Sequence, residues 1–139
     1  MIESLATLTI DIRPVCNVSG TPLGDRTVFD ITGGTIEGPR LRGAVLGSGG
    51  DWVTRTPTRA QMDVRLLIQA SDRTTILLRY TGRASQRDGR QRIEIAGAFE
   101  APQGAHGWLN EIQVFGLGTA LPEGVVPPQG VRYDLYRFK

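Results

Sequence analysis

Polar and apolar residues alternate along much of the chain with a period of two, the period of a β-strand. Residues 7–13 and 62–69 show this alternation most clearly. Further runs, which alternate or are rich in β-branched residues, lie at 27–32, 34–46, 74–82, 92–100, 109–117 and 131–139. Glycine and proline separate the runs at the spacing typical of β-sandwiches and barrels. Residues 102–110 have room for one helical turn, and 122–130 reads as a surface loop.

This pattern predicts an all-β fold, a single antiparallel up-and-down β-barrel of about eight to ten strands that forms one domain over residues 1–139. Consecutive hairpins favour the up-and-down order, and pairing of the first and last strands would remove both sheet edges. A length of 139 residues suits one domain. Within it, residues 47–50 (Gly-Ser-Gly-Gly) are interpreted as a tight turn that precedes Asp51.

The amino-acid composition narrows the range of partners and cofactors that we expect. The net charge is only +2, without a large cluster of basic and aromatic residues, so we expect no nucleic-acid partner. No apolar stretch has the length of a membrane helix, and the N-terminus lacks a signal-peptide pattern, so we expect no membrane partner and a cytoplasmic location. Cys16 and His106 are the only residues of their types, and phosphate-binding motifs are absent, so we predict no metal and no cofactor.

Carboxylates are the remaining candidates for catalysis. Asp51 precedes Trp52, and a carboxylate beside an indole can be desolvated, which raises its pKa toward general acid or base use. The alternative is that Asp51 caps its own turn. Glu37, set among glycines and a proline, is either a positioned base or a bulge residue.

A second set of candidates lies on predicted strands. Asp63 and Arg65 are two residues apart, so they share a face on which they can pair; simple alternation places that face outside. Glu94 and Glu100 also share a face, and the small residues between them leave room for a ligand, unless the face is simply exposed to solvent. Arg65 is the candidate cation for a substrate oxygen, and Glu100 a candidate catalytic carboxylate.

Aromatic residues are the candidates for substrate binding. Trp108 and Asn110 share a face, and an indole with an amide suits a ring that carries a carbonyl or hydroxyl group. The alternative is a core tryptophan with Asn110 in a turn. Trp52 and Tyr80 are predicted to stack on the ligand or line its pocket, and Asp63 is assigned to substrate binding with them.

Five strings, taken in order along nearly the whole chain, resemble one family: residues 33–39 (GGTIEGP), 50–52 (GDW), 63–65 (DVR), 99–100 (FE) and 108–110 (WLN). They are similar to the domain-of-unknown-function family 3237, also called uncharacterised protein family 0311. The resemblance implies an antiparallel up-and-down barrel of this length. The family has no general assigned activity, and some of its fungal relatives close rings on chalcone-like substrates as cofactor-free isomerases. The chain departs from the family pattern at 57–60 and 71–74, where Asp-Gly turns are usual, and at 106–107, where an aromatic is usual.

Three hypotheses follow. The protein is a cofactor-independent isomerase, cyclase or lyase acting on an oxygenated, partly apolar small molecule; or it is a ligand-binding barrel without chemistry; or it is a structural barrel with a filled interior. A homodimer or higher homo-oligomer remains open. Charged groups that point inward would favour the enzyme, because the other two barrels have little reason to bury them. The first hypothesis predicts that one pocket gathers residues 37, 51, 52, 65, 100 and 108.

Overall fold

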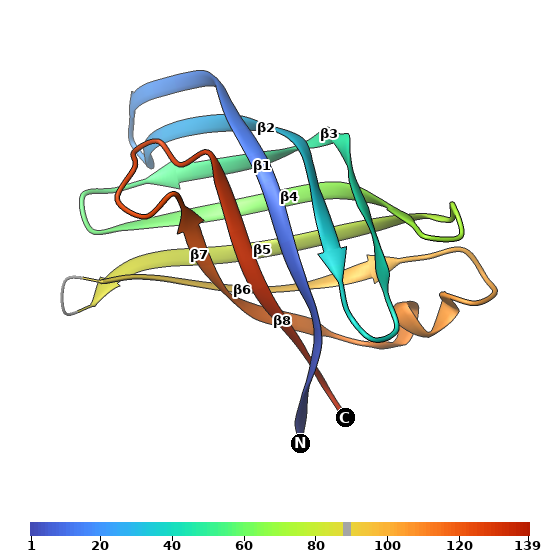
Figure 1. The fold of residues 1–139 in the computed structure, drawn as a ribbon. Coiled ribbons are helices and arrows are strands. Elements are labelled where there is room, and N and C mark those ends of the chain that lie inside the picture. Colours follow the sequence, from blue (N-terminus) through green and yellow to red (C-terminus); the bar gives the residue numbers. More distant parts are fainter. Residues whose placement is uncertain (88–89) are drawn as a thin grey trace.

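Eight antiparallel strands form a closed ring in the computed structural model, which describes residues 1–87 and 90–139 (Figure 1). Each strand pairs with the next along the chain, and the last pairs with the first, from Ile2 opposite Phe138 to Asp11 opposite Gly130. The predicted all-β, up-and-down barrel is therefore confirmed. The strands are β1 (Ile2–Thr21), β2 (Gly24–Glu37), β3 (Arg42–Arg55), β4 (Arg59–Ala70), β5 (Thr75–Arg87), β6 (Arg90–Glu100), β7 (Val114–Leu121) and β8 (Gly130–Phe138).

Several strand boundaries differ from the sequence prediction. β1 and β2 are longer than the runs that predicted them, because their exposed ends pair with each other beyond the buried part of the barrel. The predicted run 34–46 is divided, since the chain turns at 38–41 between β2 and β3. Leu109 belongs to the short 3-10 helix η1 (Gly107–Glu111) and not to a strand, and β7 begins only at Val114.

The glycine tract at 47–50 is not the predicted turn, because it lies inside β3 as a bulge. Val45 faces Ile68 of β4 and Gly49 faces Leu66, so three residues of β3 (46–48) lie opposite one residue of β4 (67). The two extra residues leave the alternation in phase, and β3 therefore resumes with Asp51 and Val53 pointing inward. Bulges of this kind bend a strand and often lie next to functional sites.

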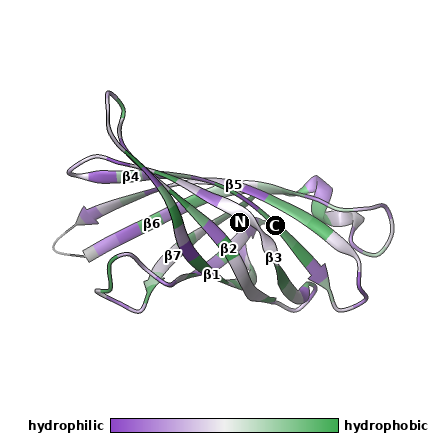
Figure 2. Ribbon diagram, turned by 90° about the horizontal axis from the view of Figure 1, so that it is seen from above, coloured by the Kyte–Doolittle hydropathy of each residue, from purple (hydrophilic) through white to green (hydrophobic). Residues whose placement is uncertain are grey.

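Hydrophobic and hydrophilic residues alternate along the strands (Figure 2), and the hydrophobic side chains fill the barrel. On β4, Met62, Val64, Leu66 and Ile68 are buried and the residues between them are more exposed. At the end where η1 lies, Leu41 and Leu109 complete the core, with 1% and 0% of their surface exposed. This end of the barrel is therefore closed by apolar packing, and we refer to it as the closed end.

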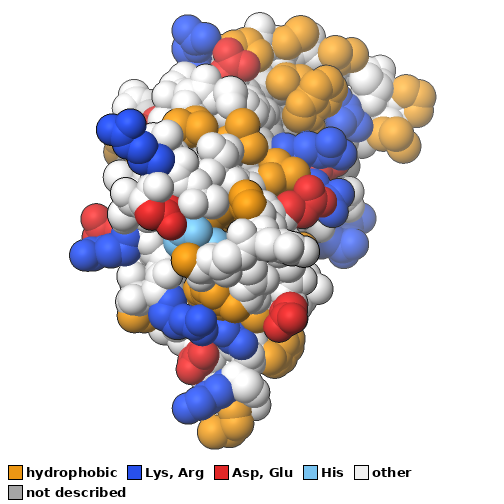
Figure 3. All heavy atoms as spheres, turned by 90° about the vertical axis from the view of Figure 1, so that its right-hand side faces the viewer, with side chains coloured by type: hydrophobic (Ala, Val, Ile, Leu, Met, Phe, Trp, Pro, Cys, Tyr) orange, Lys and Arg blue, Asp and Glu red, His pale blue; other side chains and the backbone are white. Residues whose placement is uncertain are grey.

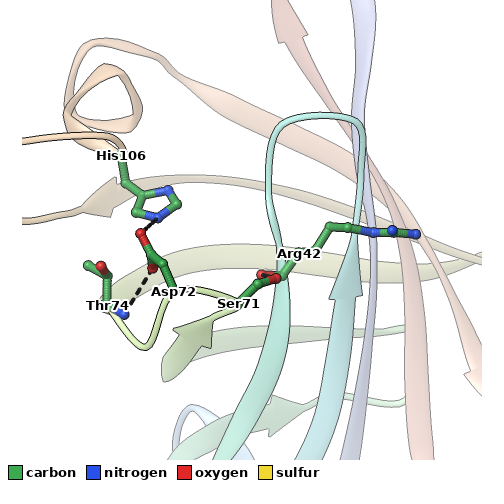
Figure 4. A network of polar contacts seen from close by, with 5 residues as sticks. All are labelled: Arg42, Ser71, Asp72, Thr74 and His106. Carbon is green, nitrogen blue, oxygen red and sulfur yellow. Dashed lines mark hydrogen bonds and ion pairs between the residues drawn. The ribbon is translucent and has the colours of Figure 1, made fainter.

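Polar contacts link the loops of the closed end (Figure 4). In the β4–β5 turn, Asp72 accepts a hydrogen bond from the Thr74 backbone N–H at 3.0 Å and lies 2.9 Å from His106 Nε2 of the β6–β7 loop. Ser71 donates from its hydroxyl to the carbonyl of Arg42 at 3.1 Å, which ties the same turn to the start of β3. The outer surface here carries interspersed acidic and basic side chains (Figure 3).

We expect Gly49→Ala to lower the free energy of unfolding by about 2 kcal/mol or more, as measured by urea denaturation. Gly49 has φ +115°, which side chains rarely adopt, and an added Cβ would collide with the backbone carbonyl of Arg65. Gly104→Ala is the matched control, because Gly104 has φ +127° with open space around it. Equal losses in the two variants would show that the close contact with β4 does not matter.

Candidate functional site

Asp51 is the one buried charged side chain in the core of the described residues, with 4% of its surface exposed. It points into the barrel from β3, between inward-facing residues of the neighbouring strands. Strand pairing puts Asp51 opposite Phe29 on one side and Val64 on the other, and Val64 in turn opposite Tyr80. The carboxylate and the Tyr80 phenol therefore lie in one cross-strand row of the interior.

Glycines leave space for two phenols beside this carboxylate. A Cβ at Gly97 would lie 2.6 Å from the Cβ of Tyr80, and a Cβ at Gly118 would lie 2.7 Å from the ring of Tyr133. The two tyrosine rings pack edge to face, with centroids 5.3 Å apart and planes at 71°. The Tyr133 hydroxyl donates to the sulfur of Met62 at 3.9 Å, and the Tyr80 hydroxyl has no hydrogen-bond partner among the described residues.

The barrel opens at the end opposite η1, through two adjoining hollows that share four lining residues. The inner hollow, of about 40 Å³, reaches Asp51 and Tyr133, and the outer hollow, of about 140 Å³, lies over the turn between β3 and β4. Apolar side chains dominate the lining of the inner hollow. Residues shared by both hollows are Arg55, Ala60, Ala84 and Gln91. We call these two hollows together the barrel mouth.

Burial controls the acidity of Asp51. Loss of solvation raises its pKa from the usual 3.8 to about 7, which the Arg55 guanidinium opposes and the Asp63 carboxylate reinforces. Oδ1 of Asp51 has no hydrogen-bond partner among the described residues, so little stabilises its charged form. A carboxyl group with a pKa near 7 holds and releases a proton readily at neutral pH, as general acid–base catalysis requires.

The phenols remain protonated over the same range. Burial raises the pKa of Tyr80 and of Tyr133 well above the usual value, and the nearby Asp51 charge adds to the rise. They are thus hydrogen-bond donors that do not ionise when Asp51 does. The mouth combines one titratable carboxyl group, a neutral phenol and a cation at the rim.

The structure does not bring the predicted site residues into one pocket, so that expectation is wrong. Only Asp51 and Tyr80 point inward, since the other candidates on strands occupy the alternate, outward positions. Glu37 lies on the outside at the end of β2, where it pairs with Thr7 and Arg42. Four predicted site residues point outward from β3, β4 and β6: Trp52, which is 51% exposed, Asp63, Arg65 and Glu100.

Trp108 and Asn110 lie at the closed end, away from Asp51. The Arg40 guanidinium lies 3.8 Å from the centre of the Trp108 ring, which packs against the core. Asn110, in η1, accepts a hydrogen bond from the Ala101 N–H at 2.7 Å and donates to the Ala101 carbonyl at 2.8 Å. This arrangement agrees with the alternative of a packed tryptophan and an asparagine in a turn.

Sequence reasoning missed Arg55 and Tyr133. Both follow from alternation once an inward residue is known: Arg55 is four residues after Asp51 on β3, and Tyr133 lies between the buried Val131 and Leu135 of β8. Arg65, the predicted partner for a buried carboxylate, is outside because it alternates with Val64 and Leu66. The cation whose charge acts on Asp51 is Arg55, which lowers the pKa of the carboxyl group.

Two further observations concern cofactors and membranes. In the described ranges 1–87 and 90–139, no three His, Cys, Asp or Glu side chains gather where they could hold a metal ion. The same part of the chain contains no helix that is long and apolar enough to span a membrane.

Fold and site together define a small closed β-barrel in which Asp51 is the one buried carboxyl group among residues 1–87 and 90–139, and it lies at the barrel mouth. The chain belongs to the family described as "Protein of unknown function (DUF3237)", whose model matches residues 2–138. This confirms the resemblance seen in the sequence strings. No curated protein matches the chain.

Solved structures share the whole fold. A beta-barrel-like protein from Acinetobacter baumannii AYE is 27% identical with a TM-score of 0.90, covering 100% of this chain and 96% of its own. A protein with unknown function from Clostridium acetobutylicum is 19% identical with a TM-score of 0.88, covering 100% and 99%. A protein from Penicillium herquei, described as an enzyme, is 22% identical with a TM-score of 0.69, covering 100% and 94%.

We expect protein stability to fall, relative to Asp51→Asn, as pH rises from about 4 to about 7. The folded protein keeps the Asp51 proton up to pH about 7, whereas the unfolded chain releases it near 3.8, so rising pH favours the unfolded chain. Three pKa units correspond to about 4 kcal/mol. The measurement is urea denaturation of both proteins across this range.

The comparison with Asp51→Asn removes contributions common to both proteins. Asp72 provides one of these, because its hydrogen bonds from Thr74 lower its pKa and act in the opposite direction. Parallel pH curves for the two proteins would contradict a raised pKa at Asp51.

Proposed function

We propose that this protein binds a small, oxygenated and partly apolar molecule at the barrel mouth, and that Asp51 transfers a proton on it in a cofactor-independent isomerisation, cyclisation or lyase reaction. The observation that carries this proposal is the buried Asp51, whose Oδ1 has no partner among the described residues and whose pKa is raised to about 7. Strongly shifted carboxyl groups in a cleft are frequent features of catalytic sites.

The chemistry is balanced without a cofactor. The ionised Asp51 removes a proton from a carbon next to a carbonyl, or from a hydroxyl group, and the electron pair moves onto the substrate oxygen. The Arg55 guanidinium, which lines both hollows, stabilises the resulting enolate or phenolate. In an isomerisation or cyclisation, protonated Asp51 then returns its proton to a different atom, so the product is an isomer and the carboxylate is restored. In a lyase reaction, the enolate re-forms the carbonyl and expels a leaving group from the next carbon, and Asp51 returns its proton to that group.

The size of the mouth restricts the substrate. A volume of about 40 Å³ beside Asp51 is far below the several hundred Å³ of a pocket that encloses a whole drug-sized ligand. Only a narrow reacting end fits beside Asp51, and the rest of the molecule would occupy the outer hollow of about 140 Å³. Polar residues of that hollow, Thr56, Thr58 and Ser85, suit hydroxyl or carbonyl groups on the substrate.

A ligand-binding barrel without chemistry is the second candidate. It uses the same mouth, because the apolar filling of the closed end leaves space inside the barrel mainly at the opposite end. The buried carboxyl group favours the enzyme, because binding alone has little use for a group whose charged form is so poorly solvated. The description of a protein with this fold as an enzyme also supports the catalytic proposal.

The proposal is tested by the rate at which the protein opens the ring of 5-nitrobenzisoxazole. Removal of one proton converts this probe to a coloured phenolate. We expect the wild-type rate to rise with pH through about 7, as Asp51 ionises. Asp51→Asn should lower the rate by about a hundredfold, the lower range for loss of a general base.

Asp134→Asn is the matched control, because Asp134 is an exposed carboxylate on β8 and should be dispensable. An Asp51→Asn rate equal to wild type would overturn the proposed role of Asp51. A wild-type rate no higher than that of free acetate would overturn catalysis and leave the ligand-binding barrel. Carbon-13 NMR of the carboxyl groups provides an independent check, since titration of Asp51 near its usual 3.8 would also defeat the proposal.

A further inference from the structure

A second hollow lies on the outer surface of the barrel, across β4, β5 and β6. Its volume of about 370 Å³ exceeds that of the mouth and falls within the range of small-molecule sites. Outward residues of three neighbouring strands form most of it, and the inward-facing pair Tyr80 and Gly97 and a residue that precedes β7 complete it. Its lining consists of Asp63, Arg65, Arg79, Tyr80, Thr81, Ala96, Gly97, Ala98 and Gln113.

Small residues of β6 account for the hollow. Strand pairing puts Arg79 opposite Ala98 and Thr81 opposite Ala96, so long or branched side chains on β5 face methyl groups on β6. The Gln113 side chain donates a hydrogen bond to the Gly97 carbonyl and thereby borders the same floor. The hollow is thus built into the strand register.

The charges around the hollow are incompletely paired. Arg65 and Arg79 lie directly opposite each other on β4 and β5, an arrangement in which like charges repel. Arg79 has a partner in Glu100 at 3.5 Å, whereas Arg65 forms no ion pair with a carboxylate of the described residues. An anion between the two guanidinium groups would remove the repulsion and accept hydrogen bonds from both.

Polar groups at the other side of the hollow refine the ligand. The Asp63 carboxylate lies two residues before Arg65 on the same face and accepts hydrogen bonds, so it favours a donor group on the ligand. The Trp52 indole lies close by: it leans over Gly50, which is the strand partner of Arg65. The exposed face of this indole offers a surface beside the hollow on which a ring of the ligand can stack.

We propose that this outer hollow is a second binding site, which takes a small carboxylic acid that also carries a hydroxyl group. The carboxylate lies between Arg65 and Arg79, and the hydroxyl group donates to Asp63. The site faces away from Asp51, so its ligand is distinct from the molecule that enters the mouth.

Mandelate and its neutral amide, mandelamide, test the charge requirement, because they share the ring and hydroxyl group. We expect mandelate to bind the wild-type protein in calorimetry and to perturb the NMR signals of Ala96 and Ala98, with mandelamide binding at least about tenfold more weakly. Arg65→Gln should weaken mandelate binding by about tenfold or more. Arg83→Gln, an equal charge change on the outward face of β5 beyond the hollow, should leave it unchanged.

Arg79→Gln provides a second variant should Arg65→Gln fail to fold, and thermal unfolding identifies that case. Equal binding of mandelate and mandelamide, equal effects of the Arg65 and Arg83 substitutions, or no mandelate binding at all would each overturn the proposal. Perturbed signals confined to Ala60 and Ala84 would also overturn it, because they would place the ligand at the barrel mouth.

Discussion

Pairing of β1 with β8 is the constraint on which the rest of the structure depends. It closes the sheet, so that every strand has two hydrogen-bonded neighbours and one face of every strand turns toward a single interior. In a barrel of eight strands that interior is just wide enough to be filled by side chains. Each inward position therefore carries either an apolar side chain or a group that must lose its water. Asp51 loses its water in this way, and so do the phenols of Tyr80 and Tyr133.

Closure also separates the two ends of the barrel. At one end, η1, the β4–β5 turn and the start of β3 are joined through hydrogen bonds of His106, Asp72 and Ser71, and Leu109 lies beneath them. At the other end, inward positions carry smaller residues such as Ala60 and Ala84, and the interior reaches solvent. The hollow at this end is the one that reaches Asp51, and Arg55 lines it.

The fold was predictable because the alternation that defines it is local. Period-two runs on eight segments, separated by glycine and proline, were sufficient for an up-and-down barrel. Boundaries were less predictable, since the glycine tract at 47–50 looks the same whether it reverses the chain or forms a bulge; the choice depends on pairing with β4, a contact between distant residues. For the same reason the pairing partners that extend β1 and β2 could not be inferred from their composition.

The site was predictable only in part. Asp51 was identified from its neighbour Trp52, yet the indole points outward and contributes nothing to the burial; the closed barrel desolvates the carboxyl group instead. Arg65 was chosen as the cation although its own alternation with Val64 places it outside. Which face of a strand is inside can be read from the sequence, but which inward residues meet depends on register and tilt. Tyr133 and Arg55 illustrate this limit.

The energetics of Asp51 favour the proposed catalytic role over a structural one. Its raised pKa means that burial disfavours the charged form, and its Oδ1 forms no hydrogen bond with the described residues to offset that cost. An apolar residue of similar volume would fill the position without this penalty, as its inward neighbours Val53 and Val64 do. The packing of the barrel therefore gives no reason for a carboxyl group at this position. The proposed function supplies one, because a molecule bound in the hollow that reaches Asp51, with Arg55 at the rim, would use the proton that the barrel keeps there.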